Sequence, residues 1–349
     1  RELTSDIINP NLRILKKEIE LVKNIELKQS EISLSKLSKL QKIFYLVKIC
    51  QKFGTLPFAG IARCAFIAKA IFNNLVEDNI LGKIKVDQFF KSIKTITNEM
   101  NLDLLKLKHN KISKKQFLKK YGHLRPSTYS ITNLAYRENF KRYFNLKMIT
   151  KNKFNNKKFF FSLKEKNKVN KWLKKNKLHF NFEQLIFFTK ESVYWRENAK
   201  FKFTKIIDKI FLILIPFMKK LGIKRNDIKH LDINILLNAF SSLSLQQLTS
   251  LIKKDININR KEYLISKKIL LPDIITNPND VYFHHIQKTS ANYIGDKTFN
   301  GEIVILDNLK INSFNLRNKI ILIENADPGY DFLFNYQIKG LITMYGGPN

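Results

Sequence analysis

Cysteine is scarce in this chain, and Cys50 and Cys64 are the only two in 349 residues. Two cysteines in a chain of this length do not form the disulfide framework of a small secreted protein, so a reducing cytoplasm is the simpler assumption. Cys64 lies in the apolar run 62–70, where a free thiol behaves as a small hydrophobic side chain. The sequence therefore predicts a cytoplasmic protein and does not favour a nucleophilic cysteine.

Long apolar runs and secretion signals are also lacking. The best candidate span, residues 210–218, is nine residues long, contains Pro216 and is flanked by lysines. About 20 apolar residues are needed to cross a bilayer, so this run is interpreted as a buried helix and no membrane partner is expected. The first ten residues show no signal-peptide pattern, and the chain begins with Arg1 rather than methionine. We expect a fragment at both ends.

Acidic residues are few, with 29 Asp and Glu against 63 Lys and Arg, which gives a net charge of +34. A strongly basic surface can bind nucleic acid by releasing counterions. However, the lysines are spread along the whole chain, Asn, Ile and Phe are over-used with them, and no zinc-finger, ribonucleoprotein or arginine-rich motif is present. This composition is typical of AT-rich coding DNA. Nucleic acid is not the expected partner, and a basic helical nucleic-acid-binding module is the non-enzyme alternative.

Metal-ligating residues form no recognisable set. The adjacent pair His284 and His285 comes nearest to one. Neighbouring residues on a strand point to opposite faces, so two adjacent imidazoles do not readily chelate one ion. We therefore predict no metal site within this chain.

Helical periodicity is present up to about residue 265, where apolar residues recur at steps of three and four. One series consists of Ile206, Ile210, Leu214, Phe217 and Leu221. Thr55, two positions before Pro57, has the pattern of a helix N-cap with proline in the first turn. Residues 147–177 are rich in Lys and Asn and are interpreted as an irregular excursion such as a hairpin. The apolar content of 44% is sufficient for a substantial core in more than one domain.

The period changes after Pro272, where short β-branched runs bounded by turn residues predict three strands. These runs are residues 299–307, 319–324 and 339–344. Between the last two, Asp327 suits a helix N-cap and a short helical stretch follows at 332–336. The order strand, helix, strand predicts a right-handed parallel crossover. We expect a domain boundary between residues 265 and 285, dividing the chain into 1–270 and 271–349.

Three sequence blocks carry a resemblance to a known family. They are residues 53–63 (FGTLPFAGIAR), residues 120–129 (KYGHLRPSTY), and residues 323–331 (IENADPGYD), the last leading into 340–347 (GLITMYGG). In this order they resemble the phosphoenolpyruvate-utilising family, which includes pyruvate phosphate dikinase and phosphoenolpyruvate synthase. A weaker fourth block is residues 195–200 (WRENAK). Together the blocks span nearly the whole chain.

The resemblance implies a multidomain protein. A mainly α-helical acceptor-binding domain would occupy residues 1–270, and the start of a β/β/α swivelling phosphohistidine domain would occupy 271–349. In this family an ATP-grasp domain phosphorylates or pyrophosphorylates a histidine, and the swivelling domain carries the phosphoryl group to the acceptor. The ATP-grasp domain, with its ATP and Mg²⁺, would lie outside this chain. The histidine follows the diglycine turn, so we expect it just after Asn349 and expect the fragment alone to be inactive.

Two segments near the C-terminus acquire roles from the resemblance. One matches the swivelling-domain motif and consists of Asp327, Pro328 and Gly329. The other matches the phosphate loop and consists of Thr343, Gly346 and Gly347. A Gly-Gly turn lets the backbone approach a phosphate because neither residue has a Cβ atom, and a helix beginning there would direct N–H groups and its positive dipole end at the anion. An ordinary strand-to-helix turn is the structural alternative.

The order of the domains narrows the choice within the family. The helical domain precedes the histidine domain, as in rifampicin phosphotransferase and in the L-glutamine kinase of capsule phosphoramidate synthesis, where the helical domain binds the acceptor. The expected acceptor is therefore a small polar molecule such as L-glutamine. Phosphoenolpyruvate synthase (pyruvate, water dikinase) and an antibiotic phosphotransferase are the alternatives.

Four side chains of the helical domain are candidates for binding the acceptor: Tyr121, His123, Arg125 and Arg63. Arginine offers a planar fork to a carboxylate or phosphate, and histidine can act as acid or base near neutral pH. In the structural alternative, residues 121–126 are a helix-ending turn and Arg63 makes a salt bridge.

Ser127 and Ser130 depart from the family pattern. They stand where relatives more often have Gly and Asp, respectively. The departure leaves open whether the acceptor pocket has the family's usual form.

Overall fold

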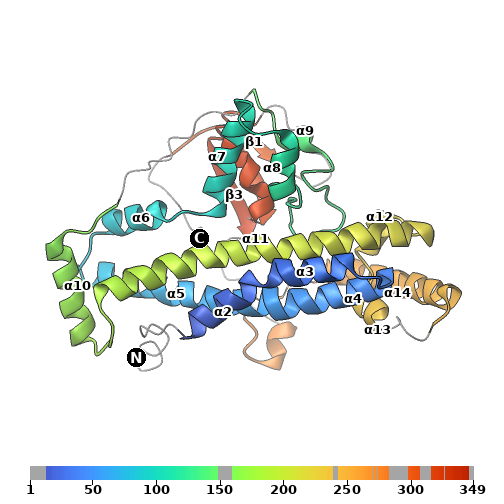
Figure 1. Ribbon diagram of the computed structural model, residues 1–349, viewed down its shortest axis with the longest axis horizontal. Coiled ribbons are helices and arrows are strands. Elements are labelled where there is room, and N and C mark those ends of the chain that lie inside the picture. Colours follow the sequence, from blue (N-terminus) through green and yellow to red (C-terminus); the bar gives the residue numbers. More distant parts are fainter. Residues whose placement is uncertain are drawn as a thin grey trace.

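A helical bundle and a smaller α/β unit make up the computed structural model (Figure 1). It describes residues 13–147, 159–238, 243–269, 271–272, 274–282, 298–306, 316–325 and 327–345. The prediction of a mainly helical chain with a parallel sheet near its C-terminus is confirmed. The α/β unit lies on the long helix α11 of the bundle (Figure 1).

The bundle is built around α11 (Phe182–Lys220), a helix of 39 residues that runs along most of the length of the molecule (Figure 1). Its first turn is closed by a capping box between Asn181 and Gln184. The other bundle elements are α2 (Arg13–Lys23), α3 (Ile25–Leu34), α4 (Lys39–Ile49), η1 (Cys50–Thr55), α5 (Leu56–Glu77), α6 (Lys83–Ser92), α10 (Leu163–Lys175), α12 (Arg225–Ile228), α13 (Ile233–Asn238) and α14 (Leu245–Ser266). A short 3₁₀ helix, η2 (Pro278–Val281), follows α14.

Helix α10 corrects the interpretation of residues 147–177 as an irregular excursion or hairpin. Ser162 and Glu165 form a capping box at its start, and Val169, Trp172 and Leu173 are its buried face. The lysines that obscured this spacing occupy the remaining faces of the same helix. Residues 148–158 lie outside the described part of the chain.

The stretch from Lys39 to Glu77 is helical without a break, because a π-helical turn, η1, joins α4 to α5. Thr55 is therefore inside this stretch and makes no capping hydrogen bond, so the predicted N-cap is wrong. The stretch is long and apolar enough to cross a membrane by length and composition, which the inspection of apolar runs missed. Half of its apolar window is buried, and α5 packs on α11 and α2 as a core helix does.

The α/β unit combines two distant parts of the sequence. Residues 96–147 contribute α7 (Ile96–Lys108), α8 (Lys114–Tyr121) and α9 (Phe140–Tyr143). The C-terminal part contributes β1 (Ile303–Ile305), β2 (Ile320–Asn325), the 3₁₀ helix η3 (Pro328–Asn335) and β3 (Gly340–Tyr345). The strands lie in the order β1-β2-β3 and are parallel, as predicted. The predicted N-cap is confirmed, because the Asp327 carboxylate accepts a hydrogen bond of 2.8 Å from the Gly329 amide.

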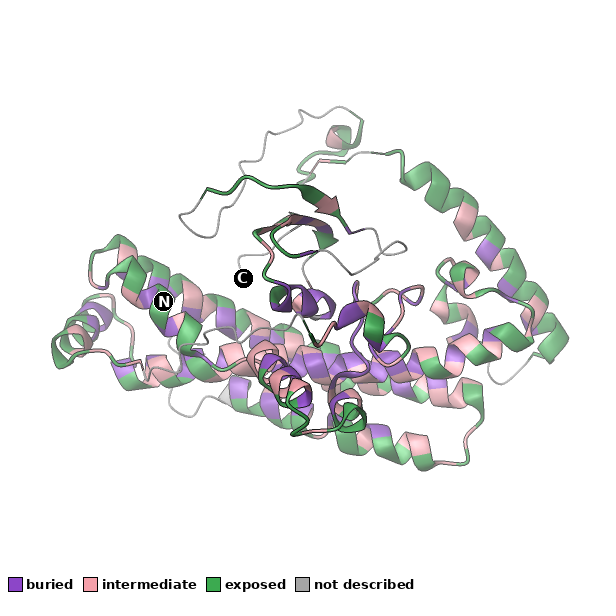
Figure 2. Cartoon of the chain, turned by 90° about the horizontal axis from the view of Figure 1, so that it is seen from above, coloured by how far each residue is buried: buried purple, intermediate pink, exposed green. Residues whose placement is uncertain are grey.

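One apolar cluster joins the C-terminal strands to residues 96–147. Ile321 and Ile323 of β2 and Phe332 of η3 are buried in it together with Phe117 and Tyr136. The expected division of the chain near residue 270 therefore does not coincide with a division between cores. Figure 2 shows buried residues gathered where the α/β unit lies on α11. On the opposite face of the sheet, Ile303, Ile305 and Ile342 are exposed.

Candidate functional site

The second and third family-like blocks meet at the carboxyl edge of the sheet. Asp327, which follows β2, accepts hydrogen bonds from the Thr128 hydroxyl at 3.0 Å and from the Thr128 amide at 3.2 Å. Thr128 is buried. Burial raises the pKa of Asp327, and the hydrogen bonds from Gly329 and Thr128 oppose this shift. These contacts fix the turn after β2 against the loop that follows α8.

Gly329 shows how closely the two blocks approach each other. A Cβ atom at this position would overlap the carbonyl oxygen of Arg125, so no larger residue fits without a backbone shift. The Tyr136 hydroxyl donates a hydrogen bond of 2.8 Å to the Gly329 carbonyl. Pro328 begins η3, and its side chain lies outside the described part.

Asp331 and α11 provide a second group of charges at the same edge. The Thr97 hydroxyl donates a hydrogen bond of 2.7 Å to Asp331. Burial raises the pKa of Asp331 to about 7, with a further upward contribution from Glu197. Lys200 acts in the opposite direction on both Asp327 and Asp331. Glu197 and Lys200 belong to the weaker fourth block, so this block also reaches the carboxyl edge.

The proposed phosphate loop begins at this edge. Thr343 is half-buried in β3 and pairs with Ile323 of β2. At the ends of the two strands, Tyr345 pairs with Asn325. The chain therefore leaves β3 beside the point where β2 leads to Asp327. Gly346 and Gly347 lie outside the described residues.

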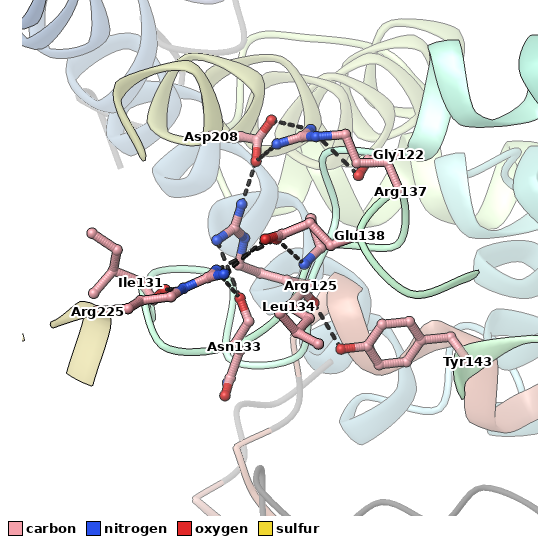
Figure 3. A network of polar contacts seen from close by, with 11 residues as sticks. Gly122, Arg125, Ile131, Asn133, Leu134, Arg137, Glu138, Tyr143, Asp208 and Arg225 are labelled. Carbon is pink, nitrogen blue, oxygen red and sulfur yellow. Dashed lines mark hydrogen bonds and ion pairs between the residues drawn. The ribbon is translucent and has the colours of Figure 1, made fainter. Parts of the chain in front are cut away.

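Arg125 is buried and bound by protein groups. Its guanidinium forms an ion pair with Asp208 of α11 and donates a hydrogen bond of 3.3 Å to the Asn133 carbonyl (Figure 3). It also lies 4.9 Å from the centre of the Phe211 ring. Arg137 binds the same carboxylate, with Nη2 at 2.7 Å from Oδ1. Burial lowers the pKa of Arg125, and Asp208 opposes that shift. This geometry corresponds to the structural alternative for Arg125.

Beside it, Arg225 of α12 holds the same loop. It donates hydrogen bonds of 2.6 Å to the Ile131 carbonyl and 2.9 Å to the Asn133 carbonyl, and it forms an ion pair of 2.7 Å with Glu138 (Figure 3). We call the contacts of Arg125 and Arg137 with Asp208, and of Arg225 with Glu138, the arginine clamp. The clamp fixes residues 121–138 on α11 and α12.

Tyr121 and His123, at the start of this segment, are also buried. The Tyr121 hydroxyl donates a hydrogen bond of 2.9 Å to Asp103. The His123 ring lies 4.7 Å from the Phe201 ring, and its Nε2 atom has no hydrogen-bond partner among the residues that the structure describes. Burial lowers the pKa of His123 well below its usual value, and Lys205 adds to the shift, so the imidazole is neutral.

Arg63 is not brought together with the other acceptor candidates. It lies on an exposed face of α5, and no hydrogen bond or ion pair within the described part of the chain joins it to Tyr121, His123 or Arg125. Two hollows in the described surface lie beside Lys253 and beside Trp172, and neither is lined by a candidate residue.

Several residues of this site were not singled out from the sequence. Asp208 is buried and lies within an apolar helical series. An acidic residue at such a position was the signal by which the sequence could have indicated it. Thr97 and Asp331 gave no comparable signal, because their partners are distant in the chain. Within the described residues, no three His, Cys, Asp or Glu side chains form a group that could hold a metal ion. His284 and His285 lie outside those residues.

No protein-family model matches the chain, and no curated protein is similar enough to it to count as a relative. The family resemblance therefore depends on the sequence blocks alone.

Proposed function

We propose that this chain belongs to an ATP-dependent, dikinase-like phosphotransferase of the cytoplasm. It would move a phosphoryl group from ATP, through a histidine just after Asn349, to a small polar acceptor such as L-glutamine. ATP and Mg²⁺ would bind to an ATP-grasp domain outside the chain. The assignment rests first on the order of the family-like blocks in the sequence.

One observation carries the proposal, namely the hydrogen bonds between Thr128 and Asp327. These two residues belong to blocks that were recognised separately and lie 199 positions apart. Asp327 also caps η3 beside the strand that leads to the diglycine turn. Such convergence is expected of segments that serve one site, because ligands of open parallel sheets bind beyond the carboxyl ends of the strands.

The two transfer steps need different groups. In the first, an imidazole nitrogen bonds to phosphorus as the bond to the ATP leaving group breaks. In the second, the acceptor nucleophile bonds to phosphorus, the P–N bond breaks, and the nucleophile loses a proton. Asp331 suits the role of proton acceptor, since burial raises its pKa to about 7. Lys200 is the nearby cation that would favour the anionic phosphoryl group.

The direct test is to incubate the full-length protein with Mg²⁺ and ATP labelled in its β- or γ-phosphate. We expect an acid-labile, base-stable phosphoprotein whose label is lost on adding the correct acceptor from a panel of L-glutamine, other amino acids, pyruvate and rifampicin. A residue other than histidine shortly after Asn349, or no labelled protein, would contradict the proposal.

Two matched variants test the carrying observation. Thr128→Val removes the hydroxyl donor to Asp327 and keeps the shape of the side chain. Thr132→Val is the control, because the Thr132 hydroxyl is paired with Ser130 instead. A hydrogen bond to a charged group contributes about 1.5–3 kcal/mol to stability, so Thr128→Val is expected to destabilise the turn after β2 by this order and thereby to slow acceptor transfer. Equal rates for the two variants would remove the Thr128–Asp327 contact from the mechanism.

A further inference from the structure

The C-terminal strands share their apolar core with residues 96–147 rather than with the bundle. Of the 19 buried side chains in this core, ten lie in 96–147 and eight in 298–345. Among the described residues, Phe201 of α11 is the one member from the bundle. Moving the strands away from residues 96–147 would expose most of this core to water, which is unfavourable for large apolar side chains.

Hydrogen bonds tie the same two segments together. Besides the contacts of Asp327, Asp331 and Gly329, the Tyr336 hydroxyl donates to the Tyr143 carbonyl at 2.9 Å and accepts from the Asn145 amide at 3.0 Å. Tyr336 is buried. The two segments are therefore joined by both apolar and polar contacts.

The contact between the α/β unit and the bundle has a different character. It is made by the arginine clamp, by the aromatic contacts of Tyr121 and His123 with Phe201, and by Ile131, which is buried in the core of the bundle. The side chains of Arg137 and Arg225 are 28% and 23% exposed, so water already reaches one edge of the clamp, whereas Arg125 and Asp208 at its centre are buried. This interface is more polar than the core that the two segments share, and polar interfaces are typical of domains that move relative to each other.

We propose that residues 96–147 and the described residues of 298–345 move as one body, and that this body separates from the bundle along the arginine clamp. The inference rests on the proposed function, which requires the phosphohistidine to travel between two sites. It differs from a swing of residues 271–349 alone, because the helices α7 and α8 would travel with the sheet. Segment 121–138 would then act as the surface that docks the moving body on α11 and α12.

Spin labels at three exposed positions test this proposal. Lys111→Cys labels the first segment of the moving body, Arg317→Cys labels the second, and Lys190→Cys labels α11. The native thiols Cys50 and Cys64 are buried, and burial raises the pKa of each to about 11, so they are not expected to take up label. Pairwise distances are measured by electron–electron double resonance in the full-length protein, with and without ATP and Mg²⁺.

We expect the 111–317 distance to keep a single narrow distribution in every condition. The 111–190 and 317–190 distances are both expected to gain a second component when ATP is added. A change in 317–190 without a change in 111–190 would overturn the proposal, because the sheet would then move alone. Unchanged distances in a protein that forms phosphohistidine would also overturn it.

A variant of the clamp makes the test independent of ATP. Asp208→Asn weakens both guanidinium contacts and is expected to broaden the two distances to position 190 while leaving 111–317 narrow. Arg137→Gln is a milder second variant in case Asp208→Asn does not fold. Asp227→Asn, which affects an exposed ion pair with Arg260 and none of the clamp contacts, is the control and should change none of the three. Broadening of 111–317 would contradict the single moving body, whereas absence of phosphohistidine would contradict only the proposed function.

Discussion

Gly329 packs directly on the backbone of Arg125, so that these two residues set the distance between the sheet and the loop after α8. A Cβ atom on Gly329 would overlap the Arg125 carbonyl oxygen. Neither group is the flexible end of a side chain, so one of the two backbones has to shift to accommodate a larger residue. The close approach explains why this position requires glycine although its φ angle is not positive.

We therefore expect Gly329→Ala to destabilise the protein by about 1–3 kcal/mol or more, the usual cost of overpacking a core. Urea denaturation measures the effect. Gly340→Ala is the matched control, because a Cβ atom there would make ordinary contacts of 3.7 and 3.8 Å with Ile320 in the same sheet. Equal midpoints for the two variants would show that the loop and the turn are not in contact in solution.

Asp208 gives a second prediction, since it is the common partner of two arginines. Removing one member of a buried ion pair typically costs about 3–5 kcal/mol, because the other charge is left buried without compensation. Asp208→Asn is expected to lower the free energy of unfolding by this order. The exposed pair of Asp227 and Arg260 provides a comparison, and its loss should cost about 1 kcal/mol or less. A small effect of Asp208→Asn in urea denaturation would mean that the clamp is open in solution.

The sequence allowed the strands to be predicted more accurately than the helices. β2 and β3 were recognisable because β-branched runs are local signals, and Asp327 before Pro328 marked the start of η3. Helix α10 was missed because lysines fill its exposed faces and separate the three buried side chains. Thr55 was misread because a π-helical turn carries the helix through Gly54. Gly54 itself fits there because it packs on Phe203, with a hypothetical Cβ atom 2.6 Å from that side chain.

The candidate site was only partly predictable for a related reason. Asp327 and Gly329 belong to a block that was singled out from the sequence, but the partners that give them their surroundings are about 200 positions away. Neither the pairing of Arg125 with Asp208 nor that of Asp331 with Thr97 leaves a pattern within one segment. Tertiary contacts of this kind depend on how the α/β unit is assembled from two distant parts of the chain.

Ser127 supplies a third prediction, because its backbone conformation is one that favours glycine. Its φ angle is +48°, in the left-handed region that favours glycine. The left-handed conformation costs a non-glycine residue about 1–2 kcal/mol, so Ser127→Gly is expected to stabilise the protein by up to about 1 kcal/mol after the greater entropy of the unfolded chain is considered. Ser130 does not have a positive φ, so Ser130→Gly should be neutral or destabilising. Thermal unfolding of both variants tests the difference.

Asp331 leads to a prediction about pH. In the folded protein, burial raises the pKa of this carboxyl group from its ordinary value of 3.8 to about 7. At pH values between these two pKa values, the folded state therefore still binds a proton that the unfolded state has already released. Stability contributed by the protonated group is complete below the unfolded pKa and is lost as the pH rises towards 7. The pKa of Asp103 is shifted in the opposite direction. Burial raises this pKa, but hydrogen bonds from Lys106, Lys120 and Tyr121 outweigh burial and lower it.

Asp331→Asn imitates the protonated carboxyl group and should remove this pH dependence. We expect the variant to match the unmodified protein near pH 4 and to become progressively more stable than it up to about pH 7, with a constant difference above that, as proton linkage requires. Melting temperatures between pH 4 and pH 8 measure the trend. Asp103→Asn serves as the control and should instead be less stable than the unmodified protein at neutral pH. A constant difference between Asp331→Asn and the unmodified protein over the whole range would mean that Asp331 is hydrated and ionised in the folded state.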